Sequence, residues 1–465
     1  MKLNRWLFGT IIGTQFAFAS YAADDVDIQA LKKQIQELDQ KVRILERERE
    51  IDQDSAAAAA KAAPKISLGA KGFNFSSSDS NFVAQLHGLV QFDSRTFFDD
   101  GGLKGNDGFL IRRARPIFQG TVFRDFDYQF TPDFGGSTVQ IQDAYLNYRY
   151  SPELQLQAGK FKSPVGLEAL QSDPATLFNE RSIATDLVPN RDLGIALKGD
   201  LFDGAASYVL GVFNGAPDYT GTSANQSFQD TKAVAARVFF QPWKNSNVNA
   251  LRGLGFGVGG SYEGDHPATN SATGLTGGYT TDGQQKFFSY KSDVFADGPH
   301  WRISPQAYYY YGPFGLLAEY VVSDQQVKKA TTGKTADFQN TAWNVSGSWL
   351  LTGEDASYTG ITPLHPFNPR NNQWGAWQLV ARFGELNVDD KVFAGSVFAD
   401  PKKSASGAQA WSVGLNWYLN KNIRANLSFA RTVFSGYTGG TPSPGTVITA
   451  AQPENVLFSR LQLAF

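Results

Sequence analysis

The chain has 465 residues, a formal net charge of −2 and no cysteine. The near-neutral charge gives no indication of nucleic-acid binding, and the lack of cysteine excludes disulfides, thiolate metal sites and cysteine nucleophiles. Aromatic residues make up 14% of the chain, with 46 glycines and one methionine. This composition is typical of strands and tight turns, with aromatic side chains at lipid boundaries.

The first 22 residues have the layout of a secretory signal peptide. Lys2 and Arg5 supply the positive start, 6–19 is an apolar run of 14 residues, and the small residues Ser20 and Ala22 mark cleavage after Ala22. The alternative is a membrane anchor helix, but the apolar run is shorter than the ~20 residues that a span needs. We therefore predict that the chain is exported.

Residues 23–54 are predicted to form a periplasmic coiled-coil helix. Apolar residues alternate at spacings of three and four, as in the a/d seam of a coiled coil: Ile28, Leu31, Ile35, Leu38, Val42 and Leu45. A solitary amphipathic helix would show the same pattern over so short a stretch. Residues 55–80 contain SAAAAAKAAPK and are predicted to be an alanine-rich tether and linker.

Residues 81–465 alternate apolar and polar side chains with a period of two. The segments are about ten residues long, the length that a tilted membrane strand needs. They predict an all-β fold, a 16-stranded antiparallel transmembrane β-barrel with an aqueous lumen. The sixteen candidate strands are 82–95, 109–122, 126–134, 139–150, 154–161, 191–200, 205–214, 233–241, 254–262, 298–311, 314–323, 338–352, 374–384, 408–420, 422–432 and 455–465.

The connections between these strands mostly alternate between long and short, as the outer loops and periplasmic turns of bacterial barrels do. Three connections break the pattern, since 135–138 is short where a loop belongs, and 242–253 and 353–373 are long where turns belong. The chain ends on Phe465, which shares one strand face with Leu461 and Leu463. A terminal aromatic on such a strand is similar to the signal that outer-membrane assembly reads.

Enzyme motifs are missing from the sequence. The four histidines form no H-x-x-x-H pair, and no nucleophile elbow, P-loop or dinucleotide fingerprint occurs. His87 lies on the polar face of the first candidate strand and is best explained as a solvated lumen residue. We expect no catalytic residue, cofactor or metal.

The segment FLIRRAR, 109–115, is the most informative local feature. Strict alternation puts Arg113 and Arg115 on one face and Arg112 on the other. An arginine facing lipid costs ~2–4 kcal/mol at the membrane midplane, so Arg112 is expected at a rim, at a subunit contact, or at a bulge that turns it inward. Basic rings select anions in pores, although a solvated arginine row would look the same.

Further charged residues flank the long connection 162–190, which could fold inward and narrow the lumen or remain an ordinary surface loop. Its Glu180–Arg181 pair, Asp173 and Asp186 could hold it to the wall. Arg191 lies directly after it. The remaining candidates for the pore constriction are Arg95, Lys160, Lys162, Arg181 and Asp143, the last of which could orient an arginine.

Several segments in order resemble the phosphate-selective porin O/P family of Gram-negative outer membranes. They span nearly the whole predicted barrel: FLIRRARPIFQGTVFRDFDYQF (109–130), QIQDAYLNYRY (140–150), LQAGKFKSPVGLE (156–168), LFNERSIATDLVPNRDLGIAL (177–197), VLGVFNGAP (209–217), SWLLTGE (348–354), WGAWQLVARFGELN (374–387) and VGLNWYLNKNIR (413–424).

The resemblance implies a homotrimer of sixteen-stranded barrels in outer-membrane lipid and lipopolysaccharide, each with a pore narrowed by its third long loop. It assigns the central anion site to Arg112 and Arg113 and matches Asp143 to an aspartate on the fourth strand. Arg115 stands where specific members carry an aromatic residue, which could extend the choice from phosphate to larger anions such as pyrophosphate. The near-neutral barrel argues against strict phosphate selectivity.

These observations predict an outer-membrane porin for passive diffusion of small anions, phosphate or polyphosphate, through an arginine-lined constriction. Two alternatives stay open. The protein could be a general porin whose arginines face acids across a wide opening, or an envelope-tethering protein that acts through its coiled coil.

Overall fold

A computed structural model describes residues 25–70, 72–98, 105–136, 138–218, 231–265, 275, 277–436 and 452–465. The expected signal peptide, 1–22, lies outside these residues. The chain divides into two compact units, 1–63 and 64–465, and each is described by itself.

The first unit contains one helix, α1 (Asp25–Ala62). It extends past the predicted end at residue 54 because the alanine run that was predicted as a tether is strongly helix-forming. It ends two residues before Pro64, which disfavours helical geometry in the residue before it. The apolar seam from Ile28 to Leu45 is exposed along the single helix. In the described part of the chain, no helix is both long enough and apolar enough to span a membrane.

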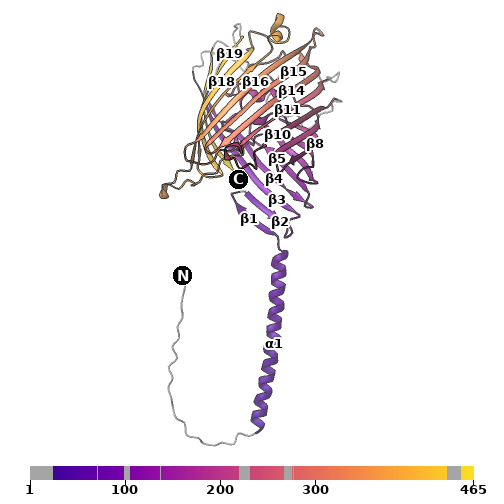
Figure 1. The fold of residues 1–465 in the computed structure, drawn as a ribbon, viewed down its shortest axis with the longest axis vertical. Coiled ribbons are helices and arrows are strands. Elements are labelled where there is room, and N and C mark those ends of the chain that lie inside the picture. Colours follow the sequence, from indigo (N-terminus) through magenta and orange to yellow (C-terminus); the bar gives the residue numbers. More distant parts are fainter. Residues whose placement is uncertain are drawn as a thin grey trace. The chain divides into compact units, whose positions relative to one another are not determined.

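The second unit is a closed antiparallel barrel of sixteen strands, wound with a pronounced tilt (Figure 1). The barrel closes where β20 pairs with β3, from Asn455 opposite Phe98 to Ala464 opposite Leu89. The predicted fold class is confirmed. The strands are β3 (Val83–Phe98), β4 (Gly108–Val122), β5 (Phe126–Asp133), β6 (Gln140–Arg149), β7 (Gln155–Lys162), β8 (Arg191–Leu201), β9 (Ala206–Phe213), β10 (Ala233–Phe240), β11 (Leu254–Asp265), β14 (Val294–Tyr311), β15 (Phe314–Lys329), β16 (Thr335–Leu350), β17 (Ala376–Asn387), β18 (Gly407–Tyr418), β19 (Ile423–Ser435) and β20 (Glu454–Ala464).

The predicted linker contains a short hairpin, β1 (Lys65–Gly69) and β2 (Gly72–Ser76). β2 pairs with the first residues of β3, from Ser76 opposite Val83 to Phe73 opposite Leu86. Because β20 pairs with β3 only from Leu89 onward, the hairpin continues the sheet where β20 ends.

The two faces of each strand differ in polarity, as the period of two requires. On β18, Trp411 and Val413 are exposed on the outside, whereas Ser412 and Asn416 are buried on the lumen side. The final residue, Phe465, pairs through both its backbone N–H and its carbonyl with Gly88 on β3, at 3.0 Å each. The last aromatic residue is therefore fixed at the seam of the barrel.

We call the end of the barrel with connections such as 123–125, 202–205 and 312–313 the turn end, and the opposite end the loop end. Two connections from the loop end fold into the lumen. The constriction loop is defined as residues 163–190, with α2 (Leu167–Leu170), η1 (Asp173–Ala175) and η2 (Ile183–Leu187); only Ser172 in it is exposed. The inner hairpin is defined as residues 277–291, with β12 (Tyr279–Thr280) and β13 (Lys286–Phe288), and none of its residues is exposed.

An apolar core therefore forms between connections inside the barrel. Phe287 and Phe288 of the inner hairpin are completely buried. They pack in one cluster with Ile183 and Leu187 of the constriction loop and with Phe398, which follows η5 (Asp390–Ser396). The described lumen is consequently narrowed at the loop end by packed chain. At the turn end, η3 (Asn249–Leu251) and η4 (Pro369–Asn371) lie in the two long connections that broke the alternation.

Candidate functional site: an arginine-lined constriction

A β-bulge determines where Arg112 points. In the ladder between β3 and β4, Gln91 pairs with Arg113 and Phe92 pairs with Ile111, so Arg112 is the extra residue. Such a bulge breaks the alternation of side chains. The Arg112 side chain reaches Glu180 of the constriction loop, with Nε 2.6 Å from Oε1 and Nη2 2.9 Å from Oε2. Of the three expected positions for Arg112, the inward bulge is the one observed.

Glu180 connects the barrel wall to the constriction loop. Besides Arg112, its Oε1 accepts a hydrogen bond of 2.9 Å from Arg95 Nη2. Burial alone would raise the pKa of the Glu180 carboxyl, but Arg112, Arg113 and Arg95 together outweigh burial and hold that pKa below its ordinary value. Glu180 is therefore an ionised anchor for two wall arginines.

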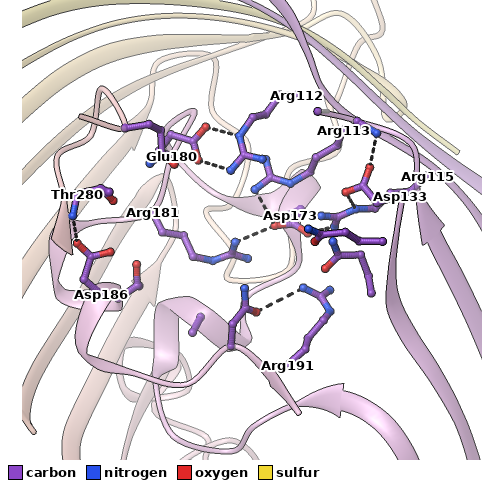
Figure 2. Close-up of a pocket in the computed structure, with 18 of the residues that line it drawn as sticks. Arg112, Arg113, Arg115, Asp133, Asp173, Glu180, Arg181, Asp186, Arg191 and Thr280 are labelled. Atoms are coloured by element: carbon purple, nitrogen blue, oxygen red, sulfur yellow. Dashed lines mark hydrogen bonds and ion pairs between the residues drawn. The ribbon is translucent and has the colours of Figure 1, made fainter. Parts of the chain in front are cut away.

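Asp173 is the second anchor and lies between three guanidinium groups (Figure 2). Its Oδ1 is 2.8 Å from Arg181 Nη1 and 3.4 Å from Arg113 Nη2, and its Oδ2 contacts Arg115. Arg115 also donates from Nε to Asp133 at 2.6 Å. Burial would raise the pKa of Asp173, but the charges of Arg113 and Arg181 hold it well below its ordinary value.

The remaining expected site residues lie close by but form different contacts. Asp143 on β6 does orient an arginine, because Arg191 donates to both of its oxygens, at 3.0 and 3.2 Å. Lys162 donates to the backbone carbonyls of Leu170 and Gln171, so it holds the C-terminal end of α2 within the constriction loop. Lys160 is buried on β7 and lies outside the linings of both cavities described next.

Two cavities meet at this arginine cluster. The loop-side cavity has a volume of about 310 Å³ and the turn-side cavity a volume of about 660 Å³. Arg115, Asp173 and Arg191 line both cavities, so they form the narrow point between them. We call these three residues, with Arg112, Arg113, Arg181 and Glu180 above them, the constriction.

The loop-side cavity carries an excess of positive charge. Five arginines line it, at positions 112, 113, 115, 181 and 191, against four carboxyl groups, at 133, 173, 180 and 186. Burial raises the pKa of Asp186 well above its ordinary value, so this carboxyl keeps its proton to a higher pH than Asp173 and Glu180, whose pKa values are lowered. The Asp186 carboxylate accepts a hydrogen bond of 2.6 Å from the Thr280 backbone N–H of the inner hairpin.

The constriction loop is held across the lumen by the opposite wall as well. Glu319 on β15 accepts hydrogen bonds from the backbone N–H groups of Leu167 and Glu168, at 3.0 and 3.1 Å. Arg382 Nη1 on β17 lies 3.3 Å from Glu168 Oε1. Arg424 on β19 donates to the Thr176 carbonyl at 2.7 Å. Contacts on both sides make the constriction a fixed feature of the lumen.

Sequence reasoning missed two parts of the site. Asp133 and Gln91, which hold Arg115 and Arg113, are short polar partners with no local pattern to mark them. The inner hairpin supplies Thr280, Thr281 and Gln284 to the loop-side cavity. A signal for it did exist, because the aromatic run Phe287-Phe288 is unusual in a solvated outer loop and indicates burial.

Comparisons with known proteins agree with this architecture. The model of the family "Phosphate-selective porin O and P" matches residues 84–452. Porin O of Pseudomonas aeruginosa is 24% identical over 389 residues, which cover 77% of this chain and 85% of that protein. Two solved structures are also similar. The outer membrane channel DcaP of Acinetobacter baumannii has a TM-score of 0.51 at 11% identity and covers 83% of this chain and 98% of its own. An anion-selective porin from Comamonas acidovorans has a TM-score of 0.49 at 12% identity and covers 82% of this chain and 99% of its own.

At 11% identity the likeness to DcaP shows the fold alone, whereas the family model covers most of the barrel. Members of this family are outer-membrane channels and not enzymes. This chain belongs to the phosphate-selective porin O and P family and is an outer-membrane porin.

Proposed function

We propose that this porin passes small oxyanions, phosphate or polyphosphate, by passive diffusion through the constriction. The observation that carries the proposal is the narrow point between the two cavities, where arginines outnumber ionised carboxylates. Guanidinium groups match the geometry of phosphate oxygens through paired N–H donors. The solute moves down its concentration gradient, and no cofactor or energy source takes part.

The arginines have different roles in this mechanism. The side chains of Arg113 and Arg115 are only 7% exposed, and they are engaged by Asp173 and Asp133. Arg112 and Arg181 are more open, at 29% and 14%, so they are the groups that meet an incoming anion. Both arginines already pair with a carboxylate, so an incoming anion competes with that carboxylate for the guanidinium group. The anion is therefore bound weakly enough to leave the site again.

The general-porin alternative requires a wide water-filled opening. The constriction loop and the inner hairpin both occupy the lumen, with nearly all of their residues buried, which supports a selective channel.

The tethering alternative has one supporting observation, the exposed apolar seam of α1. We propose that the seam pairs with copies of the same helix on the periplasmic side of a homotrimer. Deleting residues 24–63 would distinguish tethering from channel function. A loss of envelope integrity with unchanged single-channel conductance would favour tethering.

The test is the zero-current potential of the purified channel across a KCl gradient, followed by titration with phosphate. We expect anion selectivity, and phosphate should block the chloride current. Arg112→Ala should reduce both effects, whereas Arg370→Ala, a control at an exposed turn-end arginine, should change neither. Cation selectivity of the wild type, or unchanged phosphate block in Arg112→Ala and Arg113→Ala, would contradict the proposal.

A further inference from the structure

The turn-side cavity differs chemically from the loop-side cavity. The loop-side cavity has a mostly polar and charged lining. The turn-side cavity is about twice as large and combines a few charged groups with an extended apolar wall. That wall is made of Leu89, Ile117, Phe161, Pro164, Leu170, Pro174, Ala196 and Val209, with the rings of Tyr145 and Tyr358.

Two cations in this cavity are held by amide side chains and not by carboxylates in the part of the chain that the structure describes. Lys198 on β8 and Arg237 on β10 both lie opposite Val209 of β9, so the three residues form one row across the wall. Lys198 donates to the side-chain oxygen of Gln157, and Arg237 donates from Nε to Gln306 at 2.9 Å. Among the described residues neither forms an ion pair with a carboxylate, unlike Arg191, which Asp143 occupies.

The two cations lie on either side of Val209. Strands lie about 4.8 Å apart in a sheet, so the backbones of Lys198 and Arg237 are separated by roughly 10 Å. Their charged heads reach away from each other, because Gln157 lies on β7 and Gln306 on β14, so each cation is a separate contact point for an anion. The guanidinium of Arg237 already lies over the Phe239 ring, 4.4 Å from its centroid, which orients its plane and leaves Nη1 and Nη2 available. Val209 between the two cations is an apolar contact for whatever the anionic group is attached to.

We propose that the turn-side cavity is a second binding subsite, which takes an organic anion with an apolar body. The ligand class is an aryl or alkyl phosphate ester or carboxylate. Lys198 and Arg237, on either side of Val209, are the two positions at which its charged group binds, and Val209, Phe161 and Tyr145 contact its body. A volume of about 150 Å³ already accommodates benzene, so a cavity of about 660 Å³ has room for an aromatic anion. The proposal rests on the proposed function, since the ligand must be an anion that the channel admits.

The probes are phenyl phosphate and inorganic phosphate, compared as blockers of chloride current through the full-length channel at a pH where both are dianions. We expect phenyl phosphate to half-block at a concentration roughly tenfold lower, because only its ring gains apolar contact. The double variant Lys198→Gln/Arg237→Gln should remove most of this advantage. Val209→Ser should weaken block by phenyl phosphate and leave block by inorganic phosphate unchanged. Lys334→Gln, an exposed loop-end control, should behave as the wild type.

Equal half-blocking concentrations of the two probes in the wild type would overturn the subsite. An unchanged advantage of phenyl phosphate in both the double variant and Val209→Ser would overturn it too, since the ring would then bind elsewhere. Each variant is first checked for wild-type conductance, and Lys198→Gln alone replaces the double variant if that one does not assemble. A channel that selects anions and is blocked by phosphate, but gives phenyl phosphate no advantage, would retain the proposed function and lose only this inference.

Discussion

Arg112 and Glu180 lie 68 positions apart in the sequence and form a two-bond ion pair, at 2.6 and 2.9 Å, between a barrel strand and the constriction loop. The pair exists because a bulge in β4 redirects one arginine into the lumen. It also brings a positive group and its counter-charge to the constriction. Selectivity in this channel therefore depends on positions of charge, since the net charge of the whole chain is only −2.

Glu180→Gln should make the channel more anion-selective. The substitution keeps the shape of the side chain but removes the negative charge that compensates Arg95 and Arg112. The zero-current potential in a KCl gradient is expected to shift toward the chloride equilibrium potential, and phosphate should block at lower concentration. Glu385→Gln, which neutralises a carboxylate that pairs with a neighbouring asparagine on β17, is the control. A shift toward cation selectivity in Glu180→Gln would show that the loop had left its position.

Anion preference should fall as the pH is raised, because Asp186 becomes negatively charged. Burial raises the pKa of Asp186 well above its ordinary value, so the group is protonated below that raised pKa and gains a negative charge as the pH passes through it. Asp173 and Glu180 have lowered pKa values and stay ionised over the same range. The measurement is the zero-current potential across the pH range in which the channel stays assembled.

The same titration in Asp186→Asn provides the control, because this variant should lose the pH dependence and match the wild type at the low-pH end of the range, where Asp186 is protonated. The stability of the fold should also fall as the pH rises through the pKa of Asp186. A carboxyl whose pKa is raised by folding stabilises the fold below its unfolded pKa, and this contribution is lost as the pH rises through the folded value. An alkaline decline that persists in Asp186→Asn would assign the effect to another group.

Phe287→Ala should loosen the inner hairpin and raise the single-channel conductance. Phe287 is completely buried, with its ring 5.9 Å from that of Phe434, and truncating a buried phenylalanine typically costs about 3–5 kcal/mol. The barrel strands keep their hydrogen bonds, so the loss should be confined to the hairpin and its neighbours. We expect larger conductance, weaker anion preference and faster protease cleavage within 277–291.

The matched control is Phe109→Ala, because Phe109 is 76% exposed on β4. If Phe287→Ala conducts as the wild type and resists protease equally, the inner hairpin does not narrow the path.

Much of the fold could be predicted from the sequence because strand alternation is a local signal. All sixteen strands were expected close to where they lie, including β6, β7 and β8 around the constriction loop. The register was harder. Strict alternation placed Arg112 outside, and only the pairing of β3 with β4 reveals the bulge that turns it inward. The alternation of apolar and polar residues along a strand does not show where a bulge adds an extra residue.

Partners distant in the sequence were the least predictable part of the site. Asp143 was expected to orient an arginine, but its partner Arg191 lies 48 positions away, on β8, with β7 between the two strands. Sequence spacing does not identify such a partner. The inner hairpin fell between the candidate strands 254–262 and 298–311 and was not predicted, because its strands, β12 and β13, have only two and three residues. Such short strands are stable only because the barrel encloses them.

The apolar seam of α1 should pair between copies of the chain. Six apolar residues from Ile28 to Leu45 are each at least 45% exposed on the single helix, and an exposed apolar stripe of that length is stabilised by burial against a second helix. Because the chain has no cysteine, a single introduced one reports contact directly. Leu38→Cys places a thiol in the seam, where oxidation should link two copies in native membranes. Gln40→Cys lies on the opposite side of the heptad and should remain largely unlinked under the same conditions. Equal crosslinking at the two positions, or none at Leu38→Cys, would show that the seam is covered by something other than a second copy.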